Sequence, residues 1–88
     1  MKKRVLFEKE EVVKVDYYKS GELRWETPHV NDKRHGIQKW YYESGQLEME
    51  IPFVNDKEHG VRKEYNKKGE VVSTANYKNG VCVGYKLL

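Results

Sequence analysis

The sequence predicts an all-β protein, a single-layer meandering antiparallel sheet made of successive β-hairpin repeats. Three observations predict this class: a 24-residue internal period, two turn signals in every period, and alternation of apolar and polar residues between the turns. The glycines show the period in two series, each spaced by 24 residues: Gly21, Gly45 and Gly69, and then Gly36, Gly60 and Gly84. We expect all six to be structural turn residues.

The period divides the chain into units without an internal linker. We expect one domain over residues 1–88, with full repeats at 13–36, 37–60 and 61–84. Residues 1–12 are predicted to form an N-terminal cap strand and a turn, with the turn in the charged run Glu8 to Glu11. Residues 85–88 begin a terminal half repeat. The chain then has about eight strands, and its end repeats are atypical because they cap the array.

The composition restricts the class of protein. Charged residues make up 35% of the chain, but aromatic residues reach 12%, which argues against disorder. The net charge of +3 comes from 17 basic and 14 acidic residues that are interspersed, so we expect no nucleic-acid partner. Cys82 is the only cysteine, and the short apolar run after the basic start is no signal peptide, so the expected location is cytoplasmic.

The first turn of each repeat ends in glycine and follows a tyrosine. Lys19-Ser20-Gly21 is predicted to be a three-residue loop with its glycine in the left-handed conformation, because a two-residue loop would put apolar side chains opposite charged ones. The predicted apolar pairs are Tyr17–Leu23, Val15–Trp25 and Val13–Thr27, and the predicted charge pairs on the other face are Lys14–Glu26 and Asp16–Arg24.

The second turn of each repeat is Asn31-Asp32, then Asn55-Asp56 and Asn79-Gly80. A two-residue turn here gives the wrong pairing parity unless a β-bulge near Gly36 or Gly60 restores it. A longer loop is the alternative, and the sequence does not decide between them.

With this register, one face of the sheet is continuously apolar. Its members are Val13, Val15, Tyr17, Leu23, Trp25, Ile37, Tyr41, Leu47, Met49, Ile51, Phe53, Val61, Tyr65, Val71 and Tyr77. The other face is charged and is interrupted by Tyr18, Trp40 and Tyr42. Because a single sheet cannot cover its own apolar face, we expect coiling of the sheet, a second copy or a partner to cover it.

Candidate binding residues come from both predicted faces. Tyr17, Tyr41 and Tyr65 are interpreted as packing residues of the repeat. The candidates for partner binding are Tyr18, Trp40 and Tyr42 on the charged face and Trp25, Met49 and Phe53 on the apolar face.

No residue pattern indicates chemistry. His35 and His59 are equivalent and about 10 Å apart in neighbouring repeats, too far for one zinc ion. Cys82 lacks a paired histidine, and no phosphate loop, nucleophile motif or carboxylate pair is present. We expect no catalytic, cofactor-binding or metal-binding residue, no cofactor, and a protein that is not an enzyme.

At its repeated residues the chain resembles the MORN-type repeats, in the variant form found in many bacterial proteins. The shared features are Tyr17-Tyr18, Gly21, Leu23, Asn31-Asp32 and Gly36; Tyr41-Tyr42, Gly45, Leu47, Asn55-Asp56 and Gly60; and Tyr65, Gly69, Val71, Asn79-Gly80 and Gly84. Asp32 and Asp56 depart from the turn glycine of the pattern, and Asn66 departs from its second tyrosine.

The resemblance implies antiparallel hairpins in an elongated sheet, with no catalytic residues. Bacterial members are often described as antitoxin-like components of toxin–antitoxin systems, and the wider class as membrane-associated or scaffolding repeats. We therefore expect a non-catalytic protein-binding module, antitoxin-like, with a sheet face that binds a partner such as a toxin. The alternatives are a scaffold that self-associates through its apolar face or strand edges and, least favoured at a charge of +3, a peripheral membrane binder.

Overall fold

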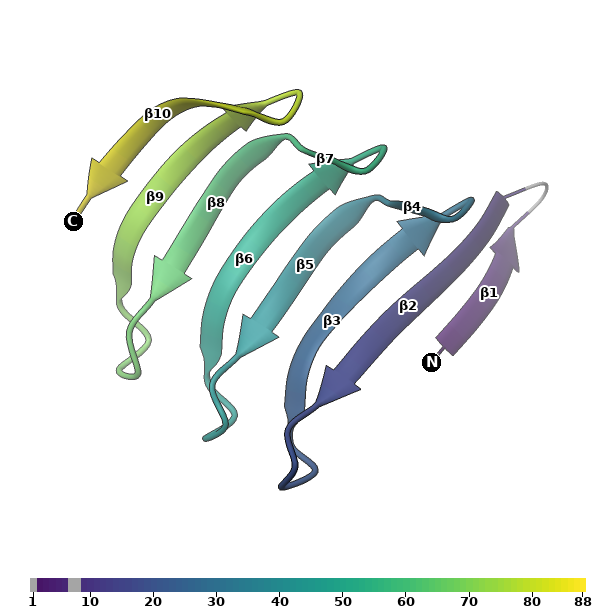
Figure 1. The fold of residues 1–88 in the computed structure, drawn as a ribbon, viewed down its shortest axis with the longest axis horizontal. Coiled ribbons are helices and arrows are strands. Elements are labelled where there is room, and N and C mark those ends of the chain that lie inside the picture. The colour runs from purple at the N-terminus through teal and green to yellow at the C-terminus, as the bar shows by residue number, and fades with distance from the viewer. Residues whose placement is uncertain (1, 7–8) are drawn as a thin grey trace.

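A computed structural model describes residues 2–6 and 9–88, with side chains for 9–88, and shows an all-β protein (Figure 1). The strands are β1 (Lys2–Leu6), β2 (Lys9–Tyr17), β3 (Leu23–Val30), β4 (Lys33–Arg34), β5 (Gly36–Tyr41), β6 (Leu47–Val54), β7 (Lys57–Glu58), β8 (Gly60–Tyr65), β9 (Val71–Lys78) and β10 (Val81–Leu87). Neighbouring strands are antiparallel in the order β1-β2-β3-β5-β6-β8-β9-β10, with β4 on β3 and β7 on β6. The predicted fold class is confirmed, and the two-residue strands β4 and β7 are additional.

The strands lie side by side in one bent layer, with the two chain ends at opposite margins of the sheet (Figure 1). The layer measures 42 × 36 × 16 Å. The charged run near the N-terminus differs from the prediction, because β2 already begins at Lys9. Residues 7 and 8 lie outside the described part of the chain, so the predicted turn is described only from Lys9 onward.

The first turn of each repeat has the predicted three-residue loop. Tyr18 N–H donates to Glu22 O at 2.9 Å, and Gly21 N–H donates to Tyr18 O at 2.9 Å. The φ angle of Gly21 is 94°, in the left-handed region that glycine tolerates best. The same bonds recur around Gly45 and Gly69.

A β-bulge follows this loop, and it makes part of the predicted register wrong. Tyr17 pairs with Leu23 as expected, but the pairing shifts at the next residue so that Arg24 is the extra residue of β3. The pairs after the bulge are Asp16–Trp25, Val15–Glu26, Lys14–Thr27 and Val13–Pro28, in place of the predicted Val15–Trp25, Val13–Thr27 and Lys14–Glu26. Asp16 and Arg24 still form an ion pair at 3.5 Å. Equivalent register shifts lie between Trp40 and Tyr41 and between Glu64 and Tyr65.

The second turn combines a two-residue loop with a bulge. Asn31 and Asp32 have φ angles of 50° and 66°, which is the left-handed pair that a tight hairpin requires. Between the pairs His29–Arg34 and Glu26–Lys39 the strand before the turn advances by three residues and the strand after it by five. The strand after the turn therefore contains two extra residues. The longer-loop alternative is therefore wrong. Because the bulge inserts an even number of residues, it does not change the pairing parity as the prediction required.

A proline and a glycine meet across this bulge. A Cβ atom on Gly36 would lie 2.9 Å from Pro28 Cγ, and Gly60 and Pro52 repeat the arrangement at 3.0 Å. Pro28 O accepts a hydrogen bond from His35 N–H, while the bulge removes the need for an N–H on the proline. In the third repeat Asn76 replaces the proline, Gly84 has no positive φ, and the shift is one residue.

The two bulges divide the predicted apolar residues between two faces, so the predicted continuous apolar face is wrong. Since paired residues share a face and neighbours along a strand alternate, the pairs Trp25–Trp40 and Trp40–Met49 define one face. We call this the aromatic face; it also carries the buried residues Thr27, Ile51, Phe53, Ser73 and Ala75. The opposite face, called the tyrosine face, carries Val13, Val15, Tyr17, Leu23, Ile37, Tyr41, Leu47, Val61, Tyr65 and Val71.

Candidate functional site

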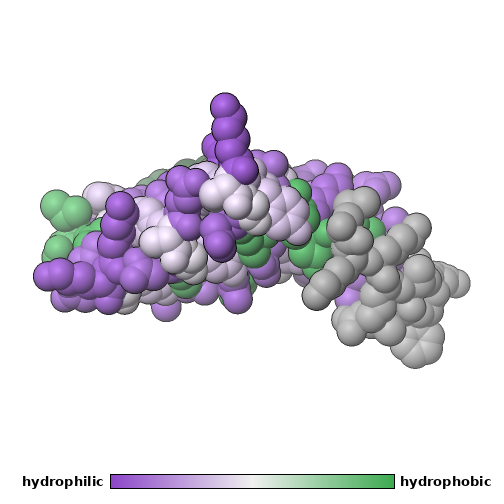
Figure 2. Space-filling model, turned by 90° about the horizontal axis from the view of Figure 1, so that it is seen from below, coloured by the Kyte–Doolittle hydropathy of each residue, from purple (hydrophilic) through white to green (hydrophobic). Residues whose placement is uncertain are grey.

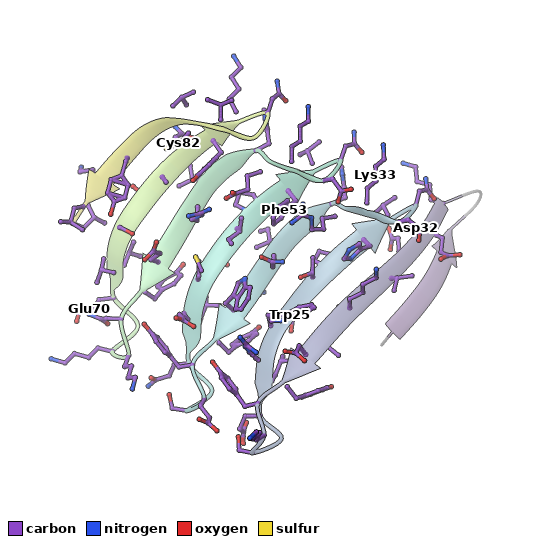
Figure 3. The ribbon with its side chains drawn as sticks, in the orientation of Figure 1. Trp25, Asp32, Lys33, Phe53, Glu70 and Cys82 are labelled. Carbon is purple, nitrogen blue, oxygen red and sulfur yellow. The ribbon has the colours of Figure 1, made fainter. Side chains whose placement is uncertain are left out.

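The six side chains predicted to bind a partner all lie on the aromatic face. The sequence had assigned Tyr18, Trp40 and Tyr42 to a face opposite Trp25, and the structure corrects this. Trp25 of β3, Trp40 of β5 and Met49 of β6 form one row across the sheet. Phe53 lies further along β6, toward the other end of the strands from Trp25 (Figure 3).

The two tryptophans are held in place by hydrogen bonds. Their ring centroids are 6.2 Å apart with the planes inclined by 44°. Trp40 Nε1–H donates to Gln38 Oε1 at 2.8 Å, and Gln38 Nε2–H donates to Thr27 Oγ1 at 2.8 Å. Thr27 is 2% exposed. Because these polar atoms are satisfied inside the protein, this part of the face presents the surfaces of the rings.

Cationic side chains cover several of the rings. The guanidinium of Arg24 lies 5.9 Å from the ring centroids of both Tyr18 and Trp40. Arg34 lies 4.4 Å from the Phe53 ring centroid, and Phe53 is only 7% exposed although no second layer covers it. Flat guanidinium groups can cover apolar rings and remain hydrated at their edges. These guanidinium groups provide part of the cover that was expected from coiling of the sheet, a second copy or a partner.

The tyrosine hydroxyls at the first turn bind backbone atoms of the next repeat. Tyr18 OH donates to Tyr41 O at 2.6 Å, and Tyr42 OH donates to Tyr65 O at 2.6 Å. Asn66 occupies the equivalent place in the third repeat and instead caps its own turn, accepting from Lys68 N–H at 2.9 Å. The second tyrosine of each pair therefore joins repeats and also lends its ring to the aromatic face.

The tyrosine face has a different chemistry. Its central row alternates in charge across the sheet, from Glu26 through Lys39 and Glu50 to Lys63. Tyr65 OH donates to Glu50 Oε1, and this hydrogen bond, with burial and the carboxylate charge, raises the pKa of Tyr65 to about 12. Burial, with the nearby Glu26 carboxylate, also raises the pKa of Tyr41. Tyrosine–carboxylate hydrogen bonds and a row of alternating charges therefore occupy this face.

The histidines form hydrogen bonds at the turns. His35 Nδ1 accepts from Asn55 N–H at 3.4 Å, and His59 Nδ1 accepts from Asn79 N–H at 3.2 Å. His29 Nδ1–H donates to Thr27 O at 3.1 Å. Within the part of the chain that the structure describes, no three His, Cys, Asp or Glu side chains are grouped to hold a metal ion. Cys82 is exposed.

Asp56 was predicted as a turn residue and not as a site residue, but it connects two successive turns. Arg34 N–H donates to Asp56 Oδ1 at 2.8 Å, Arg34 Nη2–H donates to Asp56 O at 2.9 Å, and Asp56 N–H donates to Arg34 O at 2.9 Å. The backbone hydrogen bond from Arg34, followed by its side-chain bond, lowers the pKa of Asp56. The signal was present in the sequence as an aspartate where the repeat pattern has glycine.

A single antiparallel layer of near-identical hairpins, joined turn to turn, defines the class of β-hairpin repeat proteins. The family model described as "MORN repeat variant" matches residues 34–55 and 58–79, half of the chain, and the chain belongs to this family. The family is a non-catalytic repeat module, and MORN repeats are generally associated with binding or membrane-associated functions. Neither a curated protein nor a solved structure matches the chain. The described residues include no helix that could span a membrane.

Proposed function

We propose that the protein is a non-catalytic binding module whose aromatic face binds a partner protein. The observation that carries this proposal is the gathering of Tyr18, Trp25, Trp40, Tyr42, Met49 and Phe53 on one face, where the predicted register had divided them. Tryptophan, tyrosine and arginine are the residue types that contribute most to the energy of protein interfaces.

The aromatic face is better prepared for binding than the tyrosine face. The tryptophan pair is fixed by the Gln38–Thr27 hydrogen bonds, so few side-chain rotamers remain to be ordered when a partner binds. Arg24 is about half exposed and lies against two of the rings, where it can form further bonds to a carboxylate or a backbone carbonyl. A partner with an apolar centre and an acidic or carbonyl-rich rim fits this face.

We further propose that the partner is a toxin and the protein an antitoxin-like component. The support for this finer statement is the resemblance to the bacterial repeat variants. A toxin gene next to the gene for this protein would supply the candidate. Co-expression of the two genes should relieve the growth inhibition that the toxin alone causes.

Affinity capture followed by measurement on the purified pair tests the binding face. Trp25→Ala should weaken partner binding by roughly 10- to 100-fold, as expected for a central aromatic residue. Arg24→Ala should weaken it less. The matched control is Tyr17→Ala, which removes an aromatic ring that is 57% exposed on the tyrosine face.

The variants must retain the β-sheet circular-dichroism spectrum and cooperative melting of the wild type. Calorimetric titration with the partner then separates the two faces. Unchanged affinity for folded Trp25→Ala and Arg24→Ala, with loss for Tyr17→Ala, would place the binding site on the tyrosine face and refute the proposal.

A further inference from the structure

The last strand, β10, has an open edge. It pairs with β9 on one side, and no other described strand pairs with its second side. Nine large apolar residues within 9–88 are exposed, and five of them lie in the last eight residues, 61–75% exposed: Val81, Val83, Tyr85, Leu87 and Leu88. Figure 2 shows apolar side chains at the left margin of the sheet, where β10 lies in Figure 1. This strand therefore concentrates the exposed apolar surface of residues 9–88.

The backbone of β10 offers a regular set of hydrogen-bonding groups at this edge. Leu88 N–H donates to Val72 O at 2.9 Å, so Leu88 directs its backbone groups toward β9. Backbone direction alternates along an antiparallel strand, so Lys86 also points toward β9 while Tyr85 and Leu87 point their N–H and C=O groups outward. The bulge lies between Cys82 and Gly84, and the strand is regular from Gly84 to Leu87.

The devices that protect sheet edges are nearly absent from β10. Its sequence, VCVGYKLL with Leu88 included, has one charged residue and no proline. The opposite edge strand, β1, has the sequence KKRVL with three cationic residues. In the repeat, β10 takes the place of β5 and β8, and each of those strands is paired on both sides.

We propose that the open edge of β10 pairs with β10 of a second copy, antiparallel about a twofold axis. The sequence is self-complementary in one register, in which Tyr85 lies opposite Tyr85 of the second copy. Lys86 is then opposite Gly84, and Leu87 lies toward Val83, the extra residue of the bulge, so no like charges meet. The next register places the two Lys86 side chains opposite each other, which is unfavourable.

Pairing of β10 with β10 of a second copy fits this edge better than head-to-tail pairing of β10 with β1 of another molecule. Pairing of β10 with β1 of another molecule would place an apolar strand beside three cationic residues and would continue without closing. The twofold arrangement closes, and it places the aromatic faces of both copies on the same side of one continuous sheet. This inference is independent of the proposed partner binding.

Disulfide trapping tests the register. In a Cys82→Ser background, Tyr85→Cys should form an intermolecular disulfide rapidly on mild oxidation, because Cα atoms in a hydrogen-bonded pair lie about 5.5 Å apart. The matched control is Leu87→Cys in the same background. The two residues 87 are offset by four positions, roughly 13 Å along the strand, and should remain reduced.

Light scattering coupled to size-exclusion chromatography tests the pairing itself. The wild type has a chain mass of 10.5 kDa, and the molar mass measured by light scattering should be twice that value. Tyr85→Pro removes an outward N–H that β9 does not use and should give folded monomers, whereas Tyr85→Phe should remain dimeric. A wild type that is monomeric at every concentration, or faster crosslinking through Leu87→Cys than through Tyr85→Cys, would overturn the proposal. Retention of partner binding by monomeric Tyr85→Pro would separate this result from the function of the aromatic face.

Discussion

At the scale of single residues, Gly36 and Gly84 show that equivalent positions in a repeat are not equivalent in structure. Gly36 has a φ of 115° and lies against the Pro28 ring, whereas Gly84 has no positive φ and lies opposite Asn76. The proline and the glycine at the bulge depend on each other. Where the proline is lost, in the third repeat, the glycine is no longer required by the backbone.

Gly36→Ala should therefore destabilise the protein strongly. A Cβ atom would clash with Pro28 Cγ at 2.9 Å and would hold a non-glycine residue at positive φ, which together should cost more than about 1 kcal/mol. Gly84→Ala is the matched control, because its Cβ would lie 3.8 Å from Asn76 Cβ, an ordinary contact. Urea unfolding of both variants measures the difference. Equal midpoints would contradict the conformation assigned to Gly36.

The Tyr65–Glu50 hydrogen bond gives a prediction at alkaline pH. The pKa of Tyr65 is raised to about 12 from an ordinary value of 10.0, so between these values the folded protein binds more protons than the unfolded chain. Stability that is present below pH 10 is therefore lost as the pH rises toward 12. Tyr65→Phe should flatten the pH dependence of the melting temperature in this range. The same slope in Tyr65→Phe would contradict the assignment.

At the scale of elements, the sequence predicted the turns, which glycine and asparagine mark. It missed the bulges after the first turns, which no particular residue type marks. The three-residue loop was predictable because Gly21 must adopt a left-handed conformation. The bulge after it was not, because its extra residue is Arg24 in the first repeat and the equivalent residues are Glu48 and Val72. Side chains this different share only a backbone conformation. One missed residue per hairpin moved Trp25 and Met49 to the face opposite Tyr17, and the predicted candidate site was therefore split between faces.

The turn-to-turn connection through Asp56 is testable at this scale. Asp56→Ala removes the acceptor for Arg34 N–H and for its guanidinium, so the melting temperature should fall. Asp32→Ala is the matched control, because both aspartates have a positive φ, at 66° and 70°, and both variants place alanine there. A smaller decrease is expected for Asp32→Ala. Equal decreases would show that backbone strain alone causes the effect.

Acid should weaken the same connection. The pKa of Asp56 is lowered, so its contribution to stability is present above its ordinary value of 3.8 and is lost as the pH falls through the lowered value. The melting temperature of Asp56→Ala should therefore depend less on pH in this acidic range than that of the wild type. An unchanged acid dependence would show that other carboxylates dominate.

At the scale of the whole molecule, charge and apolar surface are distributed differently. The net charge of +3 is spread over interspersed basic and acidic residues, while the exposed apolar side chains among residues 9–88 concentrate on β10. Binding to anionic vesicles should accordingly be negligible at physiological salt, because the attraction to such a surface grows with clustered basic residues. Cosedimentation with phosphatidylserine vesicles measures this. Tight binding that weakens with salt would instead support a peripheral membrane role.

The docking of each second turn on the one before it, Asp56 on Arg34 and Gly80 on Glu58, makes the length of the sheet an adjustable quantity. The backbone part of this docking is the same at both borders, so an inserted unit can repeat it. Insertion of a second copy of residues 37–60 should lengthen the sheet by two strands, roughly 10 Å. At the border between the two copies, Asp56 would dock on Glu58 where the wild type has Arg34, so the backbone hydrogen bond can be kept while the ion pair is lost. A series of such chains would act as a set of molecular rulers whose increments are set by strand spacing.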